Sequence, residues 1–170
     1  MDDLIRNSLS RFLRHVQETH WSGRENEAVN LYALGFLLGG YLFGVKIHPT
    51  KIGIEVAVAD DPKKGKNSQV RKDLVIWPKS GMNRWHPGNL PRNKPLTILE
   101  WKVQRANAAN PRGTKHDLDW MKIYSRKSAR PGFIGYCVFL DLRSAQATVS
   151  VTRVAKGKSE PFLIENLNVK

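Results

Sequence analysis

The chain has 170 residues, of which 41% are hydrophobic and 25% are charged, as in an ordinary globular domain. This length excludes a small fragment that needs disulfides or metals to fold, and it excludes a large multidomain assembly. The 28 Lys and Arg residues outnumber the 15 Asp and Glu residues, which gives a formal net charge of +13 and a pI near 10.1. Such a charge favours a polyanionic partner, nucleic acid first, with a membrane surface or simple solubility as alternatives.

Cys137 is the only cysteine, so an intrachain disulfide and a Cys-rich zinc site are both excluded. A reducing, cytoplasmic location is therefore expected, and the apolar neighbours of Cys137 favour core packing over a reactive thiol. The apolar stretch from Ala28 to Val45 is near the lower length limit for a membrane span and is interrupted by Gly39-Gly40. We expect a buried helix followed by a turn here, with no signal peptide and no membrane partner.

Two helices are predicted at the start of the chain. The first runs from about Asp2 to Glu18, where apolar residues recur at helical spacing on one stripe. The second begins at Ser22, because Ser22-Gly-Arg-Glu25 has the form of a capping box. On this interpretation Glu25 has a structural role at the start of the helix.

Three strands follow. Residues Ile52, Ile54, Val56 and Val58 alternate with other residues and are expected to share one face of a strand. A turn-rich basic loop at 60–68 leads to a second apolar run at 73–77, which predicts a hairpin. After a loop from Pro78 to Pro95, residues 96–103 form the third predicted strand.

The remaining elements complete an α/β pattern. A helix is expected from Lys115 until Arg130-Pro-Gly132, followed by strands at 133–142 and 147–154, with a short extra strand or a loose end beyond Lys156. The order predicts a mixed central β-sheet flanked by helices, in a single domain spanning 1–170. Its core would cover about 22–154, preceded by an N-terminal helix at 1–20 and followed by a C-terminal tail at 156–170.

Asp73, Glu100 and Lys102 are the most informative residues. Positions i and i+2 of a strand point to the same face, so Glu100 and Lys102 project together while Trp101 faces the other way. Burying these charges is costly unless they have partners, and Asp73 on a neighbouring strand would supply a second carboxylate. Paired carboxylates suit a hard cation, Mg²⁺ or alternatively Mn²⁺, and a lysine beside the ion suits phosphodiester hydrolysis. An exposed cross-strand ion pair for Glu100 and Lys102, and a strand-start role for Asp73, are the alternatives.

This pattern resembles the PD-(D/E)XK nuclease superfamily, which has the restriction-endonuclease-like fold. The resemblance rests on Lys72-Asp-Leu-Val-Ile-Trp77 and Ile98-Leu-Glu-Trp-Lys-Val103, with a helix before and a helix after, and it spans roughly Ser22 to Val154. Lys72 stands where the family motif has proline.

The resemblance implies a role for each motif residue. Asp73 and Glu100 would be metal ligands assisted by the backbone carbonyl of Trp101, and Lys102 would serve the attacking water. Many members add a glutamate from the first core helix, and Glu27 is the matching residue here. The alternative for Glu27 is an exposed acid favoured by the helix dipole.

Basic and polar residues near these segments are candidates for contacts with the nucleic-acid backbone, with solvated surface charge as the alternative. Gln104, which follows the motif on the same strand face, could equally be a solvated strand end. The candidate nucleic-acid contacts are Lys63, Lys64, Lys66, Arg71, Lys72, Arg84, Gln104, Arg105 and Lys115.

The sequence therefore predicts a Mg²⁺-dependent nuclease that hydrolyses DNA by a metal-activated water, an endonuclease in preference to an exonuclease. A noncatalytic nucleic-acid-binding module on the same fold and a basic scaffold for an acidic protein partner are the alternatives. No small-molecule cofactor is expected, and a homodimer is expected if both strands are cut.

Overall fold

The computed structural model describes residues 1–37, 47–59, 69–79, 85–86, 90–91, 93–106, 114–144 and 147–167. In chain order the elements are α1 (Asp2–Thr19), α2 (Glu25–Leu37), the 3-10 turn η1 (Pro49–Lys51), β1 (Ile52–Ala59), β2 (Gln69–Ile76), β3 (Trp85–His86), β4 (Leu90–Pro91), β5 (Thr97–Arg105), α3 (Thr114–Lys127), β6 (Ile134–Leu142), β7 (Ala147–Ala155) and β8 (Lys158–Leu167). The predicted order of elements is confirmed, and β3, β4 and the full length of β8 are additions to it.

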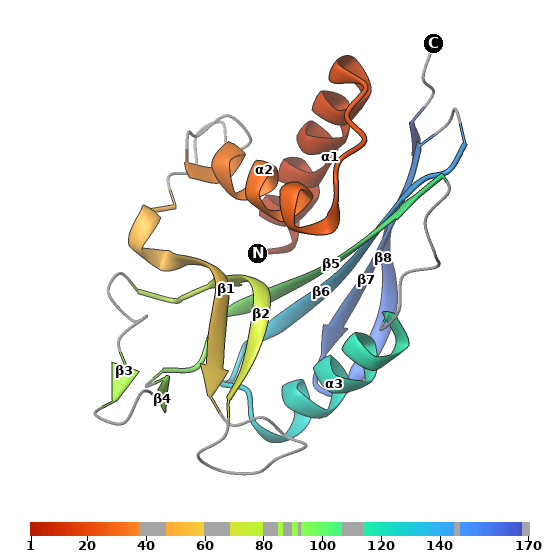
Figure 1. Ribbon diagram of the computed structural model, residues 1–170. Helices are drawn as coiled ribbons and strands as arrows, with labels where there is room; N and C mark the ends of the chain where they lie inside the picture. Colours follow the sequence, from red (N-terminus) through yellow and green to blue (C-terminus); the bar gives the residue numbers. More distant parts are fainter. Residues whose placement is uncertain are drawn as a thin grey trace.

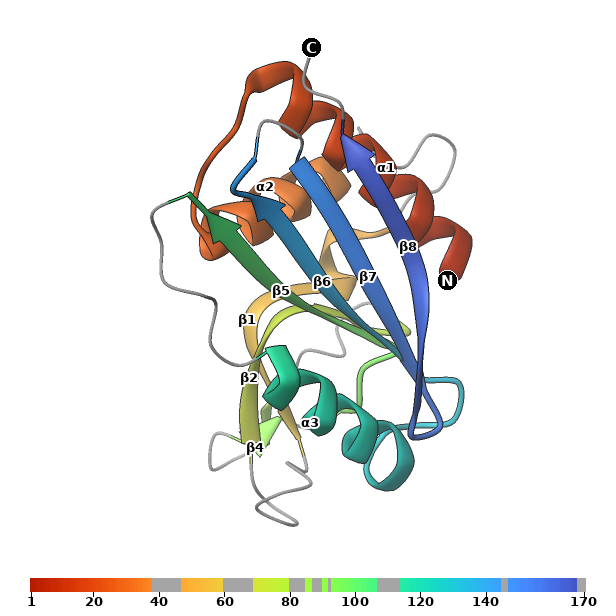
Figure 2. The ribbon, with the colours of Figure 1, turned by 90° about the vertical axis from the view of Figure 1, so that its right-hand side faces the viewer.

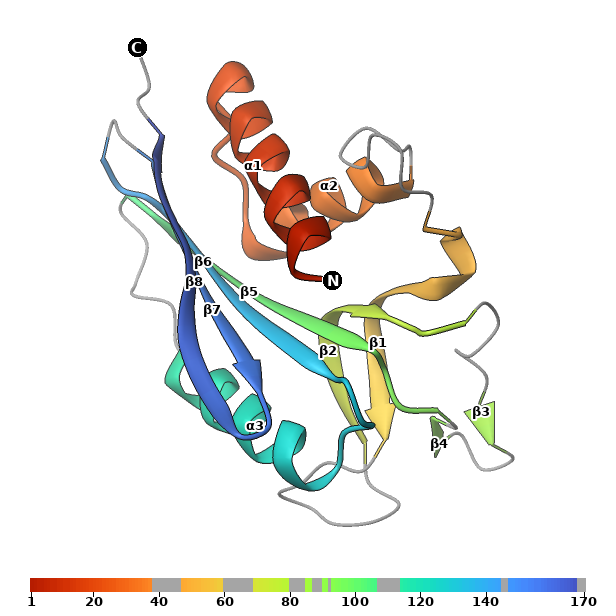
Figure 3. The ribbon, with the colours of Figure 1, turned by 180° about the vertical axis from the view of Figure 1, so that it is seen from behind.

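Six of the strands form one mixed sheet in the order β1-β2-β5-β6-β7-β8. Neighbouring strands are antiparallel except β5 and β6, which run parallel and are connected through α3. Parallel neighbours need such a crossover connection, whereas β1 and β2 form the antiparallel pair that the sequence predicts. Helices α1 and α2 lie on one side of the sheet and α3 on the other (Figure 1, and from behind Figure 3). The architecture is therefore α/β, with helices on both faces of a mixed sheet.

The larger core lies between the sheet and α1 with α2. The predicted stripe of α1 is buried there, and Phe12 packs edge-to-face against Trp101 of β5, with ring centroids 5.1 Å apart. Tyr32 of α2 joins both rings, and its hydroxyl lies 2.6 Å from the hydroxyl of Ser8. Edge-to-face aromatic pairs add about 0.5–1.5 kcal/mol beyond the burial of their area. This cluster fixes α2, and thus the start of α2, above β5.

The smaller core lies under α3. Trp120 and Tyr124 are 1% and 0% exposed and their rings stack, so this pair packs in the core under α3. Gly135 of β6 lets α3 approach closely, because a Cβ there would lie 2.4 Å from the sulfur of Met121. Helix α3 therefore rests directly on β6.

The expectation that Ile52, Ile54, Val56 and Val58 share one face is wrong. Ile52 and Ile54 pack with the core of α1 and α2, whereas Val56 and Val58 pack with the core of α3. Glu55 between them has φ of 51°, a left-handed conformation that interrupts strand alternation. The β1–β2 register skips this position. Both strands are curved in Figure 1. The irregularity lies directly opposite Asp73.

The apolar stretch from Ala28 to Val45 is helical up to Leu37, and the turn expected after it lies outside the described residues. Within the ranges that the structure describes, every helix is too short or too polar to cross a membrane.

Candidate active site

Strand β5 presents two different faces, as the alternation of its sequence predicts. Trp101 is fully buried in the core of α1 and α2. Glu100 and Lys102 project to the opposite face, where Asp117 of α3 lies beside Lys102. Glu100 is only 5% exposed, so these charges belong to the interior of the sheet and not to an exposed edge.

Asp73 is held where β2 separates from β5. The two strands pair only from Leu74 opposite Leu99 to Ile76 opposite Thr97. Beyond this ladder, the Asp73 side chain accepts a hydrogen bond from the Trp101 backbone N–H at 2.7 Å. The carboxylate thus replaces the strand partner that the backbone of β5 would otherwise need, because a buried N–H without an acceptor is costly.

Lys102 is surrounded by oxygen atoms from three elements. Its Nζ donates to Glu25 Oε1 at 2.9 Å and to the Trp101 carbonyl at 2.8 Å, and it lies 3.2 Å from Asp117 Oδ2. Burial by itself would lower the pKa of Lys102, but the carboxylates of Glu25, Asp117 and Asp73 outweigh burial and raise it. Lys102 is therefore an ammonium ion at neutral pH.

Glu100 forms a buried ion pair with Lys72. Lys72 Nζ lies 2.5 Å from Glu100 Oε1 and 3.8 Å from the centre of the Trp120 ring. Burial raises the pKa of Glu100, and the nearby carboxylates of Asp73 and Asp117 raise it further, whereas Lys72 lowers it. Since Lys72 is only 4% exposed and points inward, it is withdrawn from the residues expected to contact nucleic acid.

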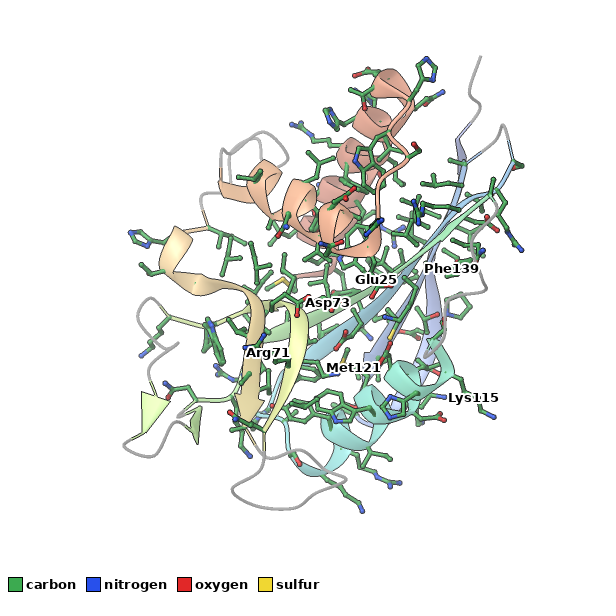
Figure 4. The ribbon with its side chains drawn as sticks, in the orientation of Figure 1. Glu25, Arg71, Asp73, Lys115, Met121 and Phe139 are labelled. Atoms are coloured by element: carbon green, nitrogen blue, oxygen red, sulfur yellow. The ribbon has the colours of Figure 1, made fainter. Side chains whose placement is uncertain are left out.

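Glu25, and not Glu27, reaches this cluster from α2. The helix begins at Glu25, three residues later than predicted, and Glu27 Oε2 accepts a hydrogen bond from the Arg24 backbone N–H at 2.9 Å. Glu27 therefore plays the capping part expected of Glu25, because its side chain reaches back to the residue before the helix. In the view of Figure 4, the labelled residues Glu25 and Asp73 lie between the ribbons of α2 and α3. Burial raises the pKa of Glu25, with a further contribution from Asp73.

Asp117 is a member of the cluster that the sequence interpretation missed. It lies in the first turn of α3, where an acid is usually explained by the helix dipole. Its spacing carried a signal, however, because Asp117 precedes Trp120, Met121 and Tyr124 by three, four and seven residues and thus shares their buried stripe. A charged residue on such a stripe needs a partner, and here the partner is Lys102.

The other expected nucleic-acid contacts are placed unevenly. Arg71 and Lys115 are exposed and Arg105 is half-buried. Gln104 is 2% exposed and donates to the Arg105 carbonyl at 3.2 Å, so it is not a solvated strand end. The remaining candidates, Lys63, Lys64, Lys66 and Arg84, lie outside the described residues.

The donor atoms of the cluster are oxygens of the kind that Mg²⁺ prefers. Asp73, Glu100, Glu25 and Asp117 bring four carboxyl groups around the amino groups of Lys72 and Lys102. In the described part of the chain, however, no three acidic, His or Cys side chains are grouped so as to hold a metal ion. The donor set fits a hard cation in its chemistry, and the Lys102 ammonium lies between the oxygens of Glu25, Asp117 and the Trp101 carbonyl.

Comparison of the chain with models of known protein families, with curated proteins and with solved structures finds no match. We therefore infer the function from the geometry of this cluster.

Proposed function

We propose that the protein is a metal-dependent nuclease that hydrolyses DNA phosphodiester bonds, with a restriction-endonuclease-like fold. The observation that carries this proposal is the group of oxygens around the Lys102 ammonium, with Asp73 bonded to the backbone of the same strand. The motif residues on β2 and β5 thus interact in the folded chain. Clusters of buried, mutually perturbed ionisable groups are typical of active sites.

In this proposal each side chain has a defined role. Asp73 and Glu100, with the Trp101 carbonyl, would hold Mg²⁺ or Mn²⁺, which when bound supplies a Lewis acid for the phosphoryl group and for water. Lys102 stays protonated, so it orients the attacking water and offsets the charge that develops on the phosphoryl oxygens. Glu25 contacts Lys102 and has a raised pKa, which suits it to accept a proton from that water.

The charge of the molecule supports DNA as the partner. A net charge of +13 favours binding of a phosphate backbone, and exposed Arg71 and Lys115 would position it near the cluster. One such site cuts one strand at a time, so cutting of both strands would require a homodimer. An endonuclease is the form of this activity that we favour.

The proposal is tested by replacing Lys102 with Met, which keeps the aliphatic part of the side chain. Supercoiled plasmid, single-stranded DNA, branched DNA and RNA are incubated with Mg²⁺, with Mn²⁺ or with EDTA. We expect metal-dependent cleavage of DNA that falls about 100-fold or more in K102M, with DNA affinity changed little. Lys158→Met, at an exposed position of β8, is the matched control and should cleave like the wild type. Equal cleavage by K102M and the wild type would overturn the proposal.

A noncatalytic nucleic-acid-binding module is the second candidate. The pairing of Glu100 with Lys72 favours it, because this pair neutralises an expected metal ligand inside the protein. Binding of DNA that weakens steeply with salt, without cleavage in any metal, would support this candidate. Absence of DNA binding would instead favour a scaffold for an acidic protein.

A further inference from the structure

A cavity of about 430 Å³ opens beside the cluster, on the face of the sheet that α3 crosses. Figure 2 looks onto this face, where α3 lies over the lower part of the strands and leaves their upper part free of helix. Thr114, Asp117 and Leu118 of α3 form one wall, and β5, β6 and β7 form the floor. A cavity of this volume lies within the range of small-molecule binding sites.

The strand register gives the floor a regular chemical order. Two rows of paired residues cross it, each with a charged residue on β5, an apolar residue on β6 and a hydroxyl on β7: Lys102, Phe139 and Ser150 in one row, and Glu100, Cys137 and Thr152 in the other. All six residues line the cavity. Because neighbouring strands lie about 4.8 Å apart, the hydroxyls of β7 are roughly 10 Å from the charged residues of β5.

This order matches the parts of one nucleotide. A phosphate would lie at the charged end, a flat base would lie over the apolar middle, and the polar edge of the base would meet the hydroxyls. Hydroxyl groups both donate and accept hydrogen bonds, and aromatic rings stack on any base, so the floor would tolerate several bases. A paired base in a duplex cannot reach such a floor unless it leaves the stack, which costs a few kcal/mol.

We propose that this cavity receives one unpaired nucleotide of the substrate strand, with its phosphate beside Lys102, its base against Phe139 and its polar edge at Ser150 and Thr152. The proposal rests on the nuclease function above and specifies its substrate: a nucleic acid with an unpaired nucleotide at the point of cleavage. Single strands, overhangs and flaps meet this condition at the lowest cost.

The test removes the hydroxyls without touching the charged cluster. Ser150→Val and Thr152→Val are combined, because valine suits a strand and has nearly the volume of threonine. One oligonucleotide sequence is offered as a single strand, as a full duplex and as a duplex with an overhang. We expect wild type to cleave unpaired positions at least tenfold faster than duplex positions, and the double variant to lose about tenfold in kcat/KM on unpaired substrates only. Ser159→Val on the exposed part of β8 is the control.

A binding measurement separates this inference from the nuclease proposal. A single strand carrying 2-aminopurine is titrated with wild type and with Phe139→Leu in EDTA, where cleavage is excluded. If wild type quenches the fluorescence of 2-aminopurine and F139L does not, the inference would be supported even if no cleavage were found. The inference about the cavity would be overturned if wild type did not quench the fluorescence. It would also be overturned if duplex and single strand were cleaved equally and the double variant had no effect. Neither result would contradict the nuclease proposal, provided that DNA is cleaved.

Discussion

Lys72 and Glu100 form an ion pair that is almost fully removed from water. They are 4% and 5% exposed, and the ammonium also faces the Trp120 ring. Removing two charges from water costs several kcal/mol, which their mutual attraction offsets only when both partners are present. A variant that removes Lys72 therefore leaves Glu100 without its counter-ion, and because burial already raises the pKa of Glu100, this carboxyl group must take up a proton to stay inside the sheet.

We accordingly predict that Lys72→Met lowers the free energy of unfolding by about 3 kcal/mol, because Glu100 loses its counter-ion. The double variant Lys72→Met/Glu100→Gln should regain most of this loss, since no charge is then left alone. Urea unfolding at pH 7 measures both, with exposed Lys79→Met as the control. If the double variant were as unstable as the single one, the loss in free energy of unfolding would come from packing on Trp120 and not from charge.

The residues of the cluster differed in how far the sequence could predict them. Strand alternation alone placed Glu100 and Lys102 on one face and Trp101 on the other. The same rule failed for Lys72, which precedes Asp73 in β2 yet reaches Glu100, because alternation is interrupted opposite Glu55. A left-handed glutamate in a strand has no local sequence signal, so the partner of Glu100 could not be foreseen.

At the scale of the elements, two acidic residues in the first turn of α2 have different contacts. Glu25 contacts Lys102, whereas Glu27 bonds the backbone of Arg24. Which acid joins the site depends on where the helix begins, and a shift of three residues in the predicted start exchanged their roles.

This geometry predicts opposite effects for matched variants. Glu25→Gln should reduce DNA cleavage about 100-fold, as expected for a general base, with little change in stability. Glu27→Gln should lower stability by about 0.5 kcal/mol at most, because the amide oxygen can still accept the Arg24 N–H bond and only the charge near the helix N-terminus is lost, and it should leave cleavage unchanged. Cleavage rates and thermal unfolding, measured for both variants, test these two expectations. Loss of cleavage in E27Q alone would return the catalytic assignment to Glu27.

Strand β8 was expected only as a short strand or loose tail, yet it runs from Lys158 to Leu167. Much of its first half is exposed, whereas Leu163 packs into the larger core and Phe162 packs against it. An edge strand needs only one buried face, so few apolar residues mark it in a sequence. The two-residue strands β3 and β4 are too short to carry any alternation.

At the scale of the whole molecule, Asp2 joins the first helix to the far strands. Its carboxylate accepts hydrogen bonds from Arg153 of β7, at 3.0 and 3.1 Å, and from the hydroxyl of Tyr136 of β6. Burial by itself would raise the pKa of Asp2, but the hydrogen bonds from Tyr136 and Arg153 outweigh burial and lower it below its usual value of 3.8.

This lowered pKa predicts a pH-dependent contribution to stability. The unfolded chain takes up the proton first, so the contribution is complete above pH 3.8 and is lost as the pH falls through the lower pKa of the folded state. Asp2→Asn should reduce the free energy of unfolding at pH 7 by up to about 1 kcal/mol, since the site is partly exposed. Urea unfolding between pH 2.5 and 7 should show the two proteins converging in acid. Exposed Asp3→Asn is the control, and a difference that persists in acid would contradict the prediction.

The contact between Asp2 and Arg153 also has a consequence for folding during synthesis. The two residues are 151 positions apart, so α1 leaves the ribosome long before the strands that cover its apolar stripe exist. Helix α2, which follows α1 in the chain, contacts α1 early through Tyr32 and Ser8. We therefore expect docking of the helical pair onto the finished sheet to be the last and slowest step of folding. Since α2 carries Glu25, Lys102 would lack this carboxylate partner until the helical pair has docked.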